Sequence, residues 1–140
     1  MKLSSLDQIA QLLVLNAKKR DPDSLNQSYK MRMAAAYGLE RFWGEHLRLQ
    51  KKEPEKSAYW KETWDALVSV MKTAGVEIPN DRVDPEKTQE VYAMSQRLWT
   101  ELNMDKQRVA IAVLTQLCDC IVWWTQRYKG KSDANTELNP

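Results

Sequence analysis

Few residues of this sequence could carry out acid–base or nucleophilic chemistry. The 140 residues include one histidine, His46, so a catalytic triad and a histidine-rich metal site would both lack partners. The Glu-x-x-His spacing of di-iron helical bundles is absent as well. His46 falls on the apolar face of a predicted helix, which favours a packed, hydrogen-bonded histidine over a catalytic one. The sequence therefore predicts a protein that is not an enzyme, with no catalytic residue, no metal and no cofactor.

Asp119 is the one acidic residue in an unusual place, because it lies inside the apolar run Val109 to Trp124. A buried carboxylate there would need a hydrogen-bond donor or a raised pKa, which is the remaining enzymatic possibility. The alternative is that Asp119 pairs with an Arg or Lys of a neighbouring helix or subunit, and we favour this. Cys118 and Cys120 point about 200° apart on a helix, so they predict free, buried thiols in a reducing compartment.

Basic residues offer a more specific hypothesis. Arg41, Arg48 and Lys52 are spaced by seven and four residues, so they share one stripe of a predicted helix, and such a stripe could follow a phosphate backbone. Alternatively it is a solvated face on which Glu45 neutralises Arg41 and Arg48. The nearby cations that could join the stripe are Lys51, Lys56 and Lys61, and a further cluster at the end of the first helix comprises Lys18, Lys19 and Arg20.

Charge is distributed unevenly along the chain. The net charge is only +2, but residues 1–61 have 12 Lys and Arg against 7 Asp and Glu, whereas residues 62–140 have 9 against 12. The balance is thus +5 in the first part and −3 in the second. Acidic residues of one copy could therefore meet the basic part of the next in a repeating contact.

Tryptophan and tyrosine are numerous, with six and five residues. Two of them, Trp123 and Tyr59, fall off the predicted apolar faces, so we expect one or both to be exposed, for a subunit interface or for stacking on a base. The tryptophans expected in the core are Trp60, Trp64, Trp99 and Trp124.

Composition and periodicity together predict an all-α protein. A chain of 140 residues with 43% hydrophobic residues suits one globular domain, and four Gly and five Pro leave room for only a few long elements. Apolar spacing predicts about five helices. Their expected ranges are 5–18, a second from 26–28 to about 51, 55–74 with Gly75 as its stop residue, a fourth that Asp84 caps with Pro85 at its first position, and a fifth from 103–105 to about 129.

The last predicted helix is apolar almost all the way round, so we expect it to be central, with neighbours on most sides. The predicted domain is a bundle covering residues 1–130, followed by a flexible tail over residues 131–140. No signal peptide and no uninterrupted apolar stretch of about 20 residues is present. We therefore expect a cytoplasmic protein that has no membrane partner.

The run VAIAVLTQLCDCIVWWTQRY at residues 109–128, taken with the preceding basic second helix, resembles the small subunit of CRISPR-Cas effector complexes. The similarity is greatest to the C-terminal helical region of the type I-D large subunit. It covers about residues 5–130 and concerns length, helical organisation and the last helix. That family has no catalytic motif, so the resemblance identifies no individual contact residue.

The resemblance implies a non-catalytic helical subunit of a crRNA-guided surveillance complex. Several copies would assemble head to tail along the filament, beside the large subunit and the backbone subunits. Basic residues would contact crRNA and target DNA through the backbone and stabilise the target and displaced strands of the R-loop. The alternative is a helical adaptor that binds only protein through its tryptophan-rich surfaces.

Overall fold

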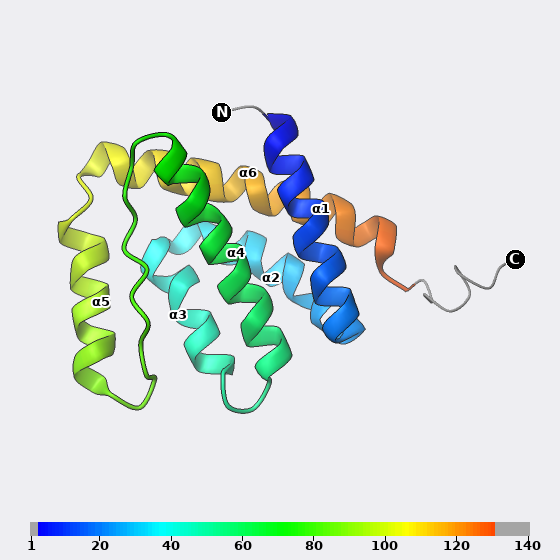
Figure 1. The fold of residues 1–140 in the computed structure, drawn as a ribbon, viewed down its shortest axis with the longest axis horizontal. Helices are drawn as coiled ribbons and strands as arrows, with labels where there is room; N and C mark the ends of the chain where they lie inside the picture. Colours follow the sequence, from blue (N-terminus) through cyan, green and yellow to red (C-terminus); the bar gives the residue numbers. More distant parts are fainter. Residues whose placement is uncertain (1–2, 131–140) are drawn as a thin grey trace, which may run out of the picture.

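The computed structural model describes residues 3–130, and the predicted tail lies outside the described residues. Within that range the chain is all-α and contains no strand, as predicted. Six α-helices and two short 3₁₀ turns follow one another (Figure 1). Their bounds are α1 Leu3–Arg20, η1 Pro22–Asn26, α2 Gln27–Ala34, η2 Ala35–Tyr37, α3 Leu39–Leu49, α4 Pro54–Thr73, α5 Thr88–Thr100 and α6 Met104–Tyr128.

The predicted second helix is two helices, which corrects the expectation of one helix to about residue 51. Gly38 separates α2 from α3 with φ +113° and ψ 161°, a backbone conformation that only glycine adopts readily. The apolar periodicity continues across the break, because Met31 and Ala35 before it and Phe42 after it are all buried. The sequence pattern therefore gave no sign of the change in direction.

The end of α4 confirms the prediction at Gly75, which has φ +85°, while the Val76 N–H donates to the carbonyl of Met71 at 2.9 Å. The start of the next helix was predicted wrongly. Asp84 does not cap it: its carboxylate accepts from the Glu86 N–H at 3.0 Å and closes a turn, and α5 begins only at Thr88. Asp84 and Pro85 suit such a turn as well as a helix start, so local residue types could not decide.

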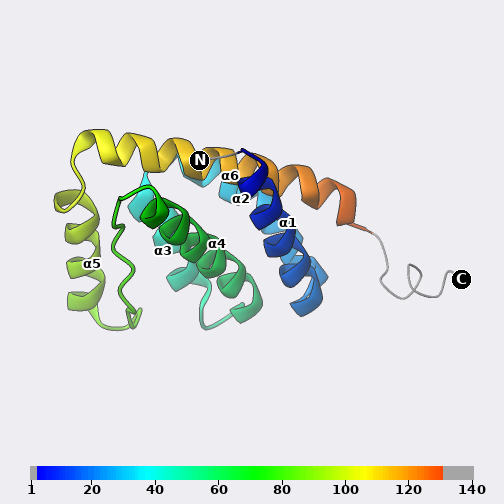
Figure 2. The same cartoon turned by 45° about the horizontal axis from the view of Figure 1, so that its top comes forward.

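α6 begins where expected, since the Asn103 side chain accepts from the Lys106 N–H at 2.8 Å. It crosses the ends of the other helices on one side of the molecule (Figures 1 and 2). Only one of its faces packs into the core, whereas Val109 and Trp123 on other faces are half exposed. The expectation of neighbours on most sides is therefore wrong. By length and composition alone α6 could span a membrane, but Leu114, Cys118 and Ile121 bury its inner face against α1 and α2.

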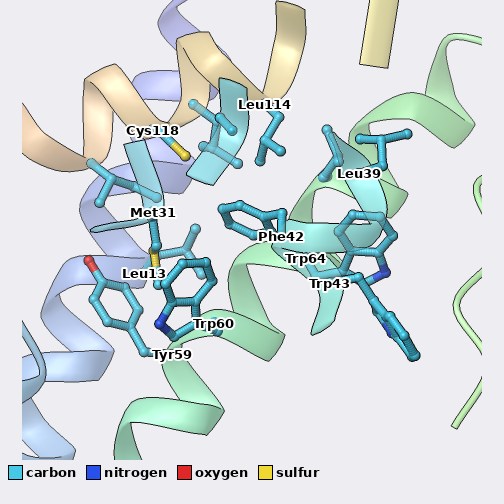
Figure 3. Packing of buried hydrophobic residues seen from close by; sticks show 14 of the residues in the cluster. Leu13, Met31, Leu39, Phe42, Trp43, Tyr59, Trp60, Trp64, Leu114 and Cys118 are labelled. Carbon is cyan, nitrogen blue, oxygen red and sulfur yellow. The ribbon is translucent and has the colours of Figure 1, made fainter. Parts of the chain in front are cut away.

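The core lies between α1, α3, α4 and α6 and is rich in aromatic rings (Figure 3). The Phe42 and Trp60 ring centroids are 4.8 Å apart. Trp60 and Trp64 are fully buried as predicted. Tyr59 is fully buried too, so the expectation that one or both of Trp123 and Tyr59 are exposed is met by Trp123 alone. Trp99 is 50% exposed, the reverse of the expectation for that residue. α5 buries Met94 and Leu98 instead, which turns Trp99 outward. Trp123 is exposed, as expected, and Trp124 is half-buried.

Candidate nucleic-acid interface

Two residues of the predicted basic stripe, Arg41 and Arg48, lie on one side of an open groove between α2 and α3. Because the chain changes direction at Gly38, the other side of the groove is formed by α2 and η2, which precede the predicted stripe. Lys30 and Tyr37 come from this second side, and the groove has a volume of about 530 Å³. The buried Trp60 of α4 forms part of its wall.

Sequence reasoning found Arg41 and Arg48 but missed Lys30 and Tyr37. The signal was present, because residues 30, 37, 41 and 48 are spaced by seven, four and seven, which continues the same stripe backwards. The predicted stripe extends only from Arg41 toward the C-terminus. Lys30 carries a third cation to the groove, and Tyr37 carries an aromatic ring that is 66% exposed. Together with Arg41 and Arg48 on α3, these two residues line both sides of the groove.

The groove contains two carboxylates as well as three cations. Glu45 accepts two hydrogen bonds of 2.9 Å from Arg48, and this pair raises the pKa of the Arg48 guanidinium. Glu40 lies in the first turn of α3, where the helix dipole favours a negative charge. Within the described residues neither Lys30 nor Arg41 makes an ion pair. Glu45 therefore neutralises Arg48 and not Arg41, so two exposed cations remain available to an anion.

The other predicted cations of the stripe do not continue into the groove. Lys51 pairs with Glu86 beyond the end of α3, and Lys61 pairs with Asp65 and donates to Asn80 at 3.2 Å. Lys52 and Lys56 lie beside a mixed-charge hollow whose acidic members are Asp21, Asp23, Glu53 and Glu55.

Glu53 lines this hollow. The Lys56 ammonium donates to Glu53 at 2.5 Å and lowers the pKa of that carboxyl, with smaller contributions from Lys30 and Arg48 in the same direction. Lys30 and Arg48 thus act on Glu53 electrostatically, and acidic side chains surround Lys52 and Lys56 in the hollow.

The cluster at the end of α1 is engaged mainly in internal contacts. Lys18 is buried and its Nζ donates to the backbone carbonyl of Tyr128 at 3.0 Å, which ties α1 to the end of α6. Arg20 forms an ion pair of 2.8 Å with Glu62 of α4. Lys19 is exposed. The structure therefore places this cluster apart from the groove.

The residues considered for catalysis have structural partners. His46 is buried, its Nδ1 lies 2.6 Å from the Trp43 carbonyl, and burial lowers its pKa. Asp119 is exposed on α6 and pairs with Arg32 of α2 at 2.5 Å, the arrangement that we favoured. Of the thiols, Cys118 is buried and burial raises its pKa to about 12, whereas Cys120 is only half-buried, contrary to expectation.

No group of three or more His, Cys, Asp or Glu side chains within residues 3–130 is placed to hold a metal ion. Comparisons with known proteins give no identification, because no family model, no curated protein and no solved structure matches this chain. The groove geometry and the sequence resemblance are therefore the observations from which a function can be proposed.

Proposed function

We propose that this protein is a non-catalytic small subunit of a crRNA-guided CRISPR effector complex, and that its α2–α3 groove binds a nucleic-acid strand through the backbone. The single observation that carries the binding proposal is the groove, in which Lys30 and Arg41 are exposed cations beside the exposed ring of Tyr37. The assignment to a CRISPR complex rests on the sequence resemblance, which concerns residues 109–128 and the basic second helix predicted from the sequence.

The groove chemistry suits recognition that does not depend on sequence. Lys and Arg side chains contact phosphates of any nucleotide, and an aromatic ring stacks on any base, because every base has a π-face. Formation of an R-loop is nearly balanced in free energy, so a few phosphate contacts can favour the open state. This is the effect that a backbone-binding subunit would supply.

Binding by one free copy should be weak. The net charge is only +2, and one of the three groove cations, Arg48, is already paired with Glu45. In a complex, several copies and the larger subunits would hold many such grooves on one strand, so the weak contacts would act together. The partners proposed are the large subunit, the backbone subunits, crRNA and target DNA.

A binding measurement tests the groove. We would titrate the protein with single-stranded oligothymidylate at several salt concentrations, and compare Lys30→Gln/Arg41→Gln with the control Lys72→Gln/Arg108→Gln. Both variants lose two positive charges, but only the first changes the groove. Losing two phosphate contacts should reduce the slope of log affinity against log salt by about 1.4 for a single strand. Equal losses in both variants would contradict a specific role for the groove.

Purification of the tagged protein from its own cells at mild salt tests the assignment to a complex. Recovery with larger subunits and an RNA of defined length that contains repeat sequence is the expected result. Recovery of proteins without RNA would contradict the assignment, even if the groove binds oligonucleotides.

The second candidate function is a protein-only helical adaptor, which the exposed tryptophans favour. Trp99 on α5 and Trp123 on α6 are 50% and 46% exposed, and large aromatic side chains often anchor protein interfaces. An adaptor would keep its partners when Lys30 and Arg41 are neutralised. The small-subunit proposal expects the neutralised protein to remain in the complex while the complex retains target DNA less well.

A further inference from the structure

The outward face of α5 carries no charged side chain. This helix lies at one end of the molecule, and the loop between α4 and α5 runs along its inner side (Figures 1 and 2). Side chains on the outward face are exposed or half-buried, and they are Gln89, Tyr92, Ala93, Gln96, Trp99 and Thr100. Charged residues make up 29% of the chain, so a solvated helix face of this length would ordinarily include some.

The charged residues of α5 point the other way, toward the loop. Arg97 pairs with Asp81 of the loop and donates to Glu101 at 2.7 Å, and Glu90 accepts from the Asp84 N–H at 2.9 Å. Both charged side chains of α5 therefore have a partner on the inner side or at the edge of the helix. The outward face is left with two large aromatic side chains among neutral ones, since Tyr92 is 60% exposed and Trp99 is 50% exposed.

This composition is typical of the centre of a protein interface, where Tyr and Trp are enriched and charged residues are depleted. Two hydroxyl groups on or beside the face, those of Ser95 and Thr100, would not be left unpaired by a partner. Ser95 already donates to the Val91 carbonyl at 3.0 Å, and Thr100 donates to the Gln96 carbonyl at 2.7 Å. Covering the face would therefore leave neither donor without an acceptor.

We propose that the outward face of α5 binds the same face of a second copy, with the two helices antiparallel about a two-fold axis near Ser95 and Gln96. A two-fold contact brings the same surface patch of both copies together, which a charged face resists and a neutral face allows. Tyr92 and Trp99 lie seven residues apart, on either side of that axis. The antiparallel pairing thus places Tyr92 of each copy against Trp99 of the other.

The dimer should be weak and dependent on concentration. α5 has 13 residues and is therefore about 20 Å long, so one face of it buries less surface than a standard stable interface. The contact is also distinct from the head-to-tail assembly of the proposed function, because a two-fold contact closes on itself after two copies. Either can fail without the other.

Sedimentation velocity over a wide range of protein concentration tests the contact. The wild-type protein should shift from monomer to dimer, and Trp99→Glu should remain monomeric because it places a carboxylate against Tyr92. The matched control is Trp123→Glu, which changes a similarly exposed tryptophan on α6 and should leave the dimer intact. Both sites are half exposed, so far-ultraviolet circular dichroism should show that each variant folds.

A charge-pair variant tests the two-fold geometry. Tyr92→Lys/Trp99→Glu should form more dimer than Trp99→Glu alone, because each new Lys would face a new Glu of the other copy. A wild-type protein that stays monomeric at every concentration would overturn the proposal. So would a dimer that Trp123→Glu disrupts and Trp99→Glu does not, or a double variant that recovers nothing.

Discussion

The Arg48 guanidinium and the Glu45 carboxylate face each other one turn apart on α3 and share two hydrogen bonds of 2.9 Å. The pair lies in the wall of the α2–α3 groove. A phosphate that entered the groove would compete with Glu45 for the same donors, because guanidinium binds carboxylate and phosphate with the same forked geometry. Glu45 therefore limits how strongly an isolated copy can bind an anion.

Removing that competitor should strengthen nucleic-acid binding. We expect Glu45→Gln to raise the affinity for oligothymidylate and to steepen the salt dependence by about 0.7, the contribution of one phosphate contact on a single strand. Glu101→Gln is the control for net charge, because it removes a similar two-bond pair with Arg97 outside the groove and changes the net charge equally, while Arg97 keeps its partner Asp81. The same gain in both variants would mean that net charge alone is responsible.

The break at Gly38 should depend on glycine. Alanine at this position would have to adopt φ +113°, and its Cβ would lie 3.0 Å from Glu40 Oε1. We expect Gly38→Ala to reduce the free energy of unfolding by about 1–3 kcal/mol in urea titrations. Gly44→Ala should instead increase it by about 0.5–1 kcal/mol, because Gly44 is inside α3 and has open space around it. Equal stability of the two variants would contradict a strained break.

A buried set of hydroxyl groups should stabilise the contact between α2, α4 and α6. The Tyr59 hydroxyl lies 2.6 Å from Ser28 Oγ, which is 2.6 Å from Thr125 Oγ1, and burial raises the pKa of Tyr59 to about 12. Tyr59→Phe should lower the free energy of unfolding by about 1–2 kcal/mol. Tyr37→Phe, at an exposed hydroxyl, should change it by less than about 0.5 kcal/mol. A loss of similar size in both would argue against the buried network.

Acid should destabilise the fold through His46. Burial lowers the pKa of the folded histidine below its ordinary 6.5, so the unfolded chain takes up a proton first as the pH falls. The free energy of unfolding should therefore decrease below about pH 6.5, by at most about 1.4 kcal/mol per pH unit, until the pH reaches the lowered pKa.

Comparing wild type with His46→Gln in urea titrations at several pH values checks this dependence. His46 is the only histidine of the chain, so the variant should lose most of the change between about pH 7 and pH 5.5, whatever its overall stability. A variant with an unchanged pH dependence would show that other groups cause it.

Local sequence signals determined the helical class and several helix ends. Gly75 ends α4 and Asn103 begins α6 through backbone and side-chain hydrogen bonds made within a few residues, so residue type and position were sufficient. The apolar spacing likewise identified most core side chains. The pairing of Asp119 with a cation was also predictable, because a carboxylate within an apolar helix needs a partner.

Only the tertiary structure decided which predicted faces were covered. Tyr59 is buried where α4 meets α2 and α6, whose hydroxyl groups are its partners. Trp99 is exposed because, within residues 3–130, no helix lies outside α5. The groove arose the same way: the spacing of residues 30, 37, 41 and 48 was present in the sequence, but the turn at Gly38 made it concave. Periodicity reports which side chains share a face of one helix, whereas burial depends on neighbours that are distant in the chain.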